Sequence, residues 1–197
     1  MSEPTTVLSG DRQRLFLAIW PDAALAARLH ELTRRTLPPG QGRAIEARNL
    51  HLTLAFLGSV EPTCRSCVES LAGEQRPPAF TLIFDCLGYW PRSHLLWAGC
   101  SQPPAMLRSW VDHLRGVLRR CGLEPETRPF KAHLTLARNV RRYSGIARGG
   151  RVAARMRHER VDDVAPIEWP VTALKLVSSE TRPHGARYTI LREWPLG

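Results

Sequence analysis

The sequence predicts an α+β fold with two pseudo-symmetric lobes, each with a mainly antiparallel sheet and helices, and an active-site cleft between them. A repeated phrase is the first observation behind this prediction: His-Leu-Thr-Leu-Ala occurs at 51–55 and again at 133–137. The second is the similar order of elements around the two copies: strand, helix, His strand, helix and strand pair, then helix, His strand, helix and strand pair. This approximate duplication indicates that each lobe contributes one His strand to a shared cleft.

Alternating apolar residues indicate strands in the first half of the chain, and apolar residues three or four apart indicate helices. The phrase at 51–55 alternates and therefore reads as a strand. Pro and Gly residues mark where elements end. The elements expected here are a strand at 15–20, a helix at 22–36, the first His strand ended by Gly58, a short helix from Pro62 to Gly73, and paired strands at 80–86 and 95–98.

The second half begins with the clearest helix, expected at 103–121. Ser101 can cap it, Pro103 and Pro104 suit its first turn, and Gly122 follows its end. Its apolar stripe consists of Leu107, Trp110, Val111, Leu114, Val117, Leu118 and Cys121. After it we expect the second His strand, a helix at about 151–159, and strands at about 170–178 and 186–193.

Length and composition are those of a globular protein with one domain or two small lobes. Residues 1–12 are expected to form a flexible N-terminal tail. No low-complexity linker divides the remainder, so 13–197 is expected to be a single bilobal domain.

The charge is strongly basic, with a formal net charge of +10. This balance favours a polyanionic partner such as nucleic acid. Nearly all of the basic residues are Arg, which codon bias alone could produce. Between Arg138 and Arg160 eight Arg residues stand against one acid, Glu159. This basic segment is either an RNA-facing rim or a solvated face.

The five Cys residues do not have a secreted-type spacing. Cys64-x-x-Cys67 has no second Cys pair to complete a metal site, and both residues fall on the apolar side of the short helix expected after Pro62. We therefore expect core packing, reduced thiols and a cytoplasmic protein. No segment approaches the length of a transmembrane helix, and the N-terminus lacks a signal-peptide layout.

The repeated phrase carries candidate chemistry. His and Thr two positions apart share one face of a strand, and the two Leu residues share the other. Two such strands would place two imidazoles and two hydroxyls around one small volume. An imidazole base, an imidazolium acid and two hydroxyl donors suit a phosphoryl group. An ordinary half-buried strand would be the better interpretation of one copy alone, but the matched repeat favours catalysis.

Other sites have little support in the sequence. No Gly-rich nucleotide fingerprint and no Gly-x-Ser-x-Gly elbow is present. The remaining His residues lack close metal-ligand spacing and are expected to face solvent or bond locally: His30, His94, His113, His158 and His184. We therefore expect neither a metal nor a cofactor.

The chain resembles the two-histidine (2H) phosphoesterases, and among them the RNA 2′,3′-cyclic phosphodiesterases, long called 2′-5′ RNA ligases. The resemblance covers most of residues 13–196. It rests on Arg14-Leu-Phe-Leu-Ala-Ile19, Asn49 to Gly58, Leu96-Trp-Ala98, Arg128 to Arg138, and Gly185-Ala-Arg-Tyr188 with the terminal Trp194-Pro-Leu196.

The resemblance implies metal-free hydrolysis of an RNA-terminal 2′,3′-cyclic phosphate to a 2′-phosphate, and reversible 2′-5′ joining of RNA ends. By motif position, His51 matches the family's proton donor and His133 its proton acceptor. Phe16 and Arg138 match positions near the nucleotide base. Lys131-Ala132 departs from the commoner Arg-Pro before the second His. The residues alone do not say which His is the acid.

Within that chemistry, we expect Thr53 and Thr135 to hold the nonbridging phosphoryl oxygens. The expected partner is RNA with a terminal cyclic phosphate, such as a tRNA-like or other short end, bound by a monomer without a membrane. Two alternatives stay open. One is a related phosphodiesterase acting on 2′-5′ oligoadenylate or small cyclic nucleotide phosphates, and the other is a non-catalytic RNA-binding module.

Overall fold

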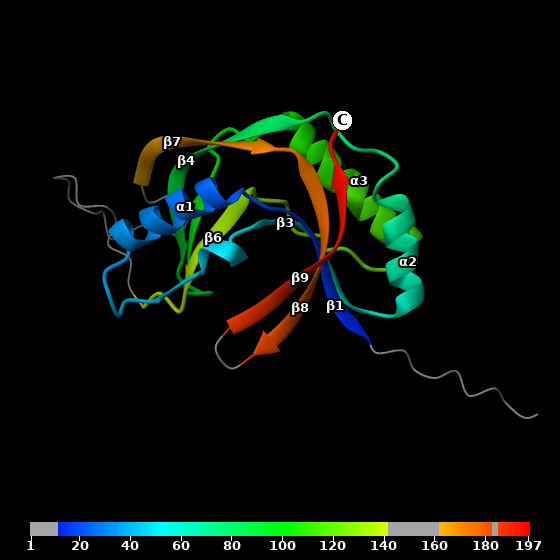
Figure 1. The fold of residues 1–197 in the computed structure, drawn as a ribbon, viewed down its shortest axis with the longest axis horizontal. Helices are drawn as coiled ribbons and strands as arrows, with labels where there is room; N and C mark the ends of the chain where they lie inside the picture. The colour runs from blue at the N-terminus through cyan, green and yellow to red at the C-terminus, as the bar shows by residue number, and fades with distance from the viewer. Residues whose placement is uncertain (1–11, 142–161, 183–184) are drawn as a thin grey trace, which may run out of the picture.

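The computed structural model describes residues 12–141, 162–182 and 185–197 (Figure 1). The expected helix at 151–159, most of the basic segment and all of the expected tail except Arg12 lie outside these residues. The elements are β1 Gln13–Ile19, α1 Ala23–Thr36, β2 Arg43–Ala44, the 3-10 turn η1 Ala47–Asn49, β3 Leu52–Val60, α2 Pro62–Leu71, β4 Phe80–Trp90, β5 Leu95–Gly99, α3 Ala105–Arg120, β6 His133–Arg138, β7 Asp162–Val171, β8 Ala173–Arg182 and β9 Gly185–Pro195.

Two antiparallel sheets make up the fold, as the sequence predicts. Sheet A has the strand order β3-β1-β8-β9, and sheet B has the order β2-β6-β5-β4-β7. Each sheet contains one of the strands that carry the repeated phrase, β3 in sheet A and β6 in sheet B. These two strands contact each other where the sheets meet.

The expected pairing of elements within each lobe is wrong in one respect. The strand pair β4 and β5 joins the second His strand, and the final pair β8 and β9 joins the first. The repeated unit is therefore β1-α1-β3 and β5-α3-β6, because in each case the strand before the helix pairs with the His strand after it. Helix α1 packs against β6 and β2 of the other sheet, and α3 packs against β3.

Local sequence explains α1 and α3, except that the expected cap of α3 is wrong: its N-cap is Pro104, and Ser101 instead bonds to the Asp85 side chain. The Asp22 side chain accepts a hydrogen bond from the Leu25 amide and caps α1. Helix α3 buries the stripe expected from its spacing: Leu107, Trp110, Val111, Leu114, Val117 and Leu118.

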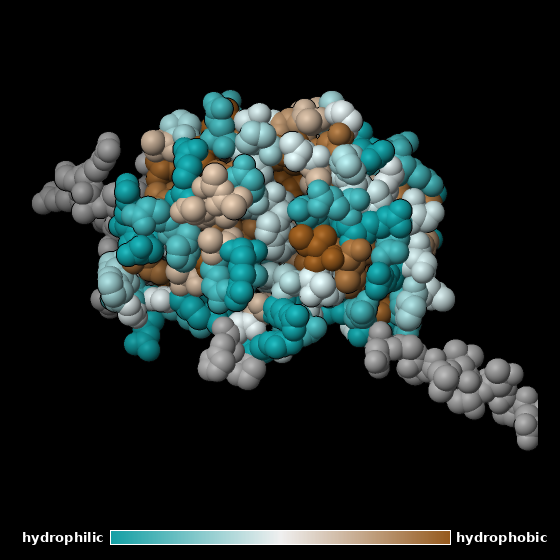
Figure 2. Space-filling view, viewed as in Figure 1, coloured by the Kyte–Doolittle hydropathy of each residue, from teal (hydrophilic) through white to brown (hydrophobic). Residues whose placement is uncertain are grey.

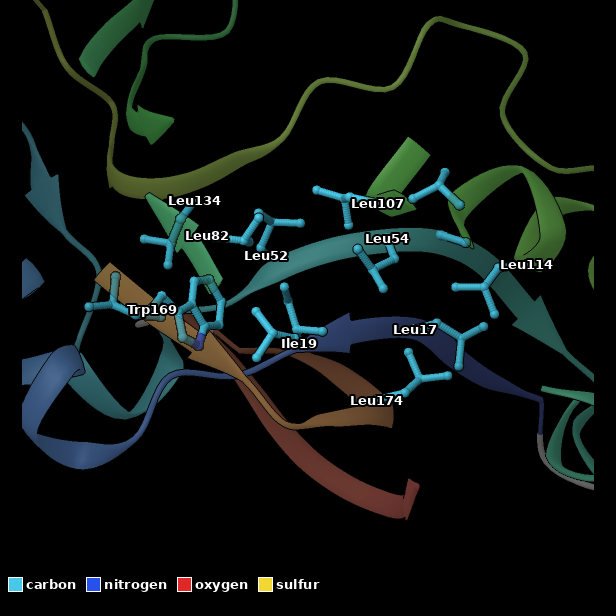
Figure 3. Packing of buried hydrophobic residues seen from close by; sticks show 14 of the residues in the cluster. Leu17, Ile19, Leu52, Leu54, Leu82, Leu107, Leu114, Leu134, Trp169 and Leu174 are labelled. Atoms are coloured by element: carbon cyan, nitrogen blue, oxygen red, sulfur yellow. The ribbon is translucent and has the colours of Figure 1, made fainter. Parts of the chain in front are cut away.

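One continuous hydrophobic core joins the two sheets and the helices. In Figure 3, Ile19 and Leu52 of sheet A lie beside Leu134 and Trp169 of sheet B, and Leu114 of α3 extends the same cluster. A smaller cluster lies on the opposite face of sheet A, formed by Phe16, Ala18 and Val177 with Trp20 and Tyr188 packed against it. Sheet A therefore has apolar residues on both faces, and the smaller cluster borders the candidate site described below.

Two strand predictions need correction. The edge strand β7 was missed, because its Pro166 and Pro170 interrupt the pattern of a strand; both are tolerated where only one side of the strand is paired. The first His strand does not end at Gly58 but continues to Val60. Gly58 has φ +77°, beside a register shift in the β1–β3 pairing, so it marks a β-bulge.

The expectation of reduced thiols is also wrong for one pair. Cys67 of α2 and Cys121, at the end of α3, form a disulfide. The two helices pack side by side, which brings the apolar face of α2 against the C-terminal end of α3 (Figure 1). Sequence spacing cannot show this, because the two residues are 54 positions apart. Cys64, Cys86 and Cys100 are not part of a disulfide.

In the view of Figure 2 most of the surface is hydrophilic, with a compact hydrophobic group over the strands β1, β8 and β9. Within the part of the chain that the structure describes, no helix is long and apolar enough to cross a membrane.

Candidate active site

The strands β3 and β6 place the two repeated phrases in equivalent positions. His51 immediately precedes β3, and His133 is the first residue of β6. In both phrases the Leu residues are buried and the His and Thr residues are half-buried, so the alternation expected from the sequence is confirmed. The buried Leu side chains anchor each strand in the core, while His and Thr lie on the other face.

Both imidazoles are oriented by the same local hydrogen bond. Nδ1 of His51 lies 2.7 Å from the carbonyl oxygen of Asn49, and Nδ1 of His133 lies 2.9 Å from that of Lys131. A carbonyl can only accept, so each Nδ1 must carry the hydrogen. In the neutral ring, Nε2 is then a base, and in the charged ring it is an acid.

Aromatic rings surround His51. Trp20 stacks on the imidazole with ring centroids 4.7 Å apart and planes 14° apart. Phe16 and Tyr188 each contact the same imidazole at a centroid distance of 5.0 Å. These residues come from β1, the residue after it, and β9, so sheet A builds the surroundings of His51.

His133 has a different set of neighbours. Trp90 of β4 lies 4.6 Å from its ring centroid at an interplanar angle of 64°, and Trp97 of β5 lies 6.4 Å away. Gly99 is the residue opposite His133 in the β5–β6 pairing. A Cβ at Gly99 would lie 2.5 Å from Cζ3 of Trp97, so the close approach of that indole requires glycine.

Burial depresses the pKa of both histidines. It lowers the pKa of His51 to about 4; the bond to the Asn49 carbonyl opposes this, and the charges of Arg138 and His133 add to it. Burial likewise lowers the pKa of His133, where the Lys131 carbonyl acts in the opposite direction and Arg138 again adds to the fall. Arg138 therefore acts electrostatically on both rings, and both are neutral at pH 7.

The other predicted site residues fall around the two rings. Thr53 pairs with Ala18 across sheet A, and Thr135 pairs with Trp97 across sheet B. Phe16 is buried beside His51. Arg138 ends β6 and is exposed, and Arg43 of β2 is the residue opposite it in the backbone pairing of the two strands.

The sequence reasoning assigned no role to Trp20, Trp90 or Tyr188. Trp20 directly follows β1, and the Ile19–Leu52 pairing in the structure is what brings it opposite His51. Tyr188 lies within a phrase that carries the family resemblance. Trp90 lies between the two strands expected at 80–86 and 95–98, whereas in the structure β4 extends to it.

The hollows described here lie away from the two histidines. Two hollows, of about 340 and 470 Å³, lie against α1, and none of the six predicted site residues lines either of them. Among the described residues, no group of three or more His, Cys, Asp or Glu could hold a metal ion.

Comparison with known proteins identifies the family. A model of the 2′-5′ RNA ligase superfamily matches residues 21–183, which include both phrases and the strands that carry them. The chain belongs to the 2′-5′ RNA ligase superfamily. Among curated proteins in which similarity was found, an RNA 2′,3′-cyclic phosphodiesterase of Escherichia coli is 35% identical, over 100% of this chain and 99% of that protein. A Thermus thermophilus protein of the same name is 29% identical, over 93% of this chain and 90% of that protein.

Solved structures of superfamily members share the fold. Escherichia coli LigT complexed with 3′-AMP superposes with a TM-score of 0.77 at 34% identity, over 94% of this chain and 99% of that one. The same protein complexed with phosphate gives a TM-score of 0.75 at 32% identity, over 95% and 99% of the two chains.

Proposed function

We propose that this superfamily member is an RNA 2′,3′-cyclic phosphodiesterase, which hydrolyses a terminal 2′,3′-cyclic phosphate to a 2′-phosphate. The observation that carries the proposal is the matched pair of imidazoles, each with Nδ1 held by a carbonyl and Nε2 left for proton transfer. The names of the relatives from Escherichia coli and Thermus thermophilus support the same substrate.

The reaction follows from the roles of the two rings. Neutral His133 takes a proton at Nε2 from water as the water oxygen bonds to phosphorus. The bond from phosphorus to O3′ breaks on the opposite side, and protonated His51 gives its Nε2 proton to O3′. The product carries a 2′-phosphate and a 3′-hydroxyl. Proton exchange with solvent returns both rings to their starting states.

Hydroxyl and guanidinium groups stabilise the developing charge in this mechanism. Thr53 and Thr135 donate to the nonbridging oxygens as negative charge grows on them. Arg138 acts on both imidazoles in the free protein, so it is near enough to attract the anionic phosphate and its nucleotide. Phe16 offers an aromatic ring beside His51 for the terminal nucleotide.

The bound substrate also favours the protonated form of His51 that the mechanism requires. A pKa of about 4 leaves His51 neutral at pH 7 in the free protein. The cyclic phosphate is an anion, and an anion beside an imidazole favours its charged form. Binding therefore raises the pKa of His51, so that His51 becomes protonated when the substrate is bound.

The proposal also covers the domain organisation, the oligomeric state and the cellular location of the protein. Both His strands belong to one chain and contact each other, so a monomer, with 13–197 as one bilobal unit, has a complete site. A substrate of RNA supports a cytoplasmic setting. In 2′-5′ joining of RNA ends, a 5′-hydroxyl takes the place of water. His133 accepts its proton as its oxygen bonds to phosphorus, the bond from phosphorus to O3′ breaks, and His51 gives a proton to O3′; cleavage of the 2′-5′ link runs these steps backwards.

The deciding experiment incubates the protein with a short RNA ending in a 2′,3′-cyclic phosphate and identifies the product. A 2′-phosphate end is expected, and an otherwise identical RNA ending in a 3′-phosphate serves as the unreactive control. Faster turnover of 2′-5′ oligoadenylate or of cyclic mononucleotides would favour the related phosphodiesterase activities instead. RNA binding without a product, unchanged in His51→Ala/His133→Ala, would identify a non-catalytic RNA-binding module.

A further inference from the structure

The indole of Trp20 lies flat on the imidazole of His51, with planes only 14° apart. Tyr188 meets the same imidazole edge-on at 80°, and Phe16 lies against it at 31°. The imidazole is therefore enclosed by three aromatic rings, of which Trp20 is the most nearly parallel and the closest by centroid distance.

A single turn of the backbone fixes both stacked rings. Trp20 Nε1 donates to the carbonyl oxygen of Arg48 at 3.0 Å, and His51 Nδ1 donates to the carbonyl oxygen of Asn49 at 2.7 Å. Both acceptors belong to the 3-10 turn η1. Because consecutive carbonyls hold the two rings, neither ring can rotate away from the other without losing a hydrogen bond.

The other histidine has no equivalent stacked ring. Ile19 pairs with Leu52, so Trp20 and His51 are the next residues along this ladder. At the corresponding place in the β5–β6 ladder, Gly99 lies opposite His133. The nearest ring to His133, that of Trp90, is tilted by 64°. The two repeated units thus differ at the position that faces the imidazole.

This difference affects how readily each imidazole carries a positive charge. The face of an aromatic ring attracts a cation, and Trp does so most strongly, whereas a neutral imidazole gains no such attraction. We propose that Trp20 is a positioning residue for the acid step, whose ring fixes the His51 imidazole and stabilises the protonated form that gives its Nε2 proton to O3′. The choice of His51 as the acid rests on the proposed function, but the effect of the ring is measurable without substrate.

Other charged groups around His51 act in the opposite direction or are already paired. Arg138 and His133 face it from β6 and disfavour its protonation. The Arg48 guanidinium of the 47–49 turn pairs with Glu46. Tyr188 is the titratable group that β9 presents to the ring. The aromatic faces and the Asn49 carbonyl are therefore what the described residues supply in favour of the imidazolium.

The test measures the pKa of His51 in the free protein by NMR titration of its Cε1–H resonance, assigned with His51→Gln. Trp20→Leu keeps an apolar side chain over the imidazole but removes the ring face. The pKa of His51 should fall by about 0.5–1 unit, the shift that a cation–π contact of ordinary strength produces. Trp20→Phe, which keeps a ring face, should recover part of this shift. Trp90→Leu is the matched control and should leave the pKa of His51 unchanged.

The direction of the shift separates this proposal from simple burial. If Trp20 only excluded water, its loss would hydrate the imidazole and raise the pKa of His51 toward 6.5. An unchanged or raised pKa in Trp20→Leu therefore overturns the proposal. Should that variant fail to fold, fluorinated tryptophans at position 20 keep the shape and weaken the ring's attraction for a cation. The pKa should then fall with each added fluorine, and a constant pKa across the series overturns the proposal equally.

Catalysis provides a second readout. In Trp20→Leu the limb of the kcat/KM profile that reports the pKa of His51 should move to lower pH, by the same amount as that pKa falls in the NMR titration. A wild-type protein that does not hydrolyse this RNA would contradict the proposed function alone, because the titration of His51 would still test the stacking of Trp20.

Discussion

His51 and His133 make the same hydrogen bond, each from Nδ1 to the carbonyl oxygen of the residue two positions earlier. This bond has two consequences. It fixes the tautomer, and it directs Nε2 of each ring away from its own backbone. The local backbone therefore prepares both rings for proton transfer, and only the protonation state has to differ between acid and base.

Loss of either ring should be severe. We expect His51→Ala and His133→Ala each to lower kcat on a cyclic-phosphate RNA by roughly 10²–10⁴-fold, the usual contribution of a positioned acid or base. The double variant should lose much less than the product of the two single losses, because the groups act as a unit. His30→Gln, on α1, is the control and should retain normal turnover. A single variant with near-normal kcat would contradict the mechanism.

The threonines should matter for the rate more than for the fold. Thr53→Val and Thr135→Val keep the side-chain shape of these half-buried residues but remove the hydroxyl donor. We expect kcat to fall by roughly 10–10³-fold in each, with an upper limit set by the loss of one oxyanion donor. Thermal unfolding provides the control, since the midpoint should move by only a few degrees. A change in KM alone would place the hydroxyls in ground-state binding.

The pH dependence of the rate should report the depressed pKa values. The active form has His51 protonated and His133 neutral, and burial lowers the pKa of both rings in the free protein. The profile of kcat/KM, which reports the free protein, should therefore be bell-shaped with its optimum below pH 6.5. The profile of kcat should lie at higher pH, because the bound anion raises both pKa values. Identical profiles for kcat and kcat/KM would show that the bound substrate does not promote the protonation of His51.

Stability should fall as the pH is lowered. His51 has a folded-state pKa of about 4 and an unfolded value near 6.5, so the unfolded chain binds the proton more readily. The contribution of His51 to the free energy of unfolding is therefore fully present above pH 6.5, and it is lost as the pH falls toward 4. Urea unfolding at several pH values measures this, and His51→Gln should flatten the curve in that window by about 1–3 kcal/mol. An equally steep curve in the variant would assign the slope to other groups.

Most of the fold could be predicted from local patterns. Alternation revealed β3 and β6, and the 3.6-residue period revealed α1 and α3, because each of these elements buries one face; β1 differs, since it is a continuous apolar run that is buried on both faces. The exchange of strand pairs between the sheets could not be predicted. Both β4 and β8 offer an apolar face of similar length, and only packing decides which His strand lies in the same sheet.

The candidate site was predictable for the residues that repeat. His51, Thr53, His133 and Thr135 are found by comparing the chain with itself. The surrounding rings are not repeated: Trp20 corresponds to Gly99, and Tyr188 comes from the far end of the chain. The depressed pKa of each histidine depends on burial, which only the assembled structure shows.

The disulfide between Cys67 and Cys121 should stabilise the protein without serving the reaction. It closes a span of 54 residues between α2 and α3. Cross-links of this kind usually add about 2–4 kcal/mol by restricting the unfolded chain. Reduction should therefore lower the thermal midpoint by roughly 5–15 °C at this chain length. Thiol titration in denaturant should find the three free cysteines before reduction.

Two serine variants complete this test. Cys67→Ser should have the lower midpoint already and should no longer respond to reductant. Cys64→Ser, one turn earlier on the same helix, should keep both the wild-type midpoint and its response. In both variants kcat at 25 °C should stay within about twofold of wild type, because neither α2 nor the end of α3 carries a residue of the candidate site. A wild-type midpoint that reductant does not change, together with five titratable thiols, would contradict the cross-link between the two helices.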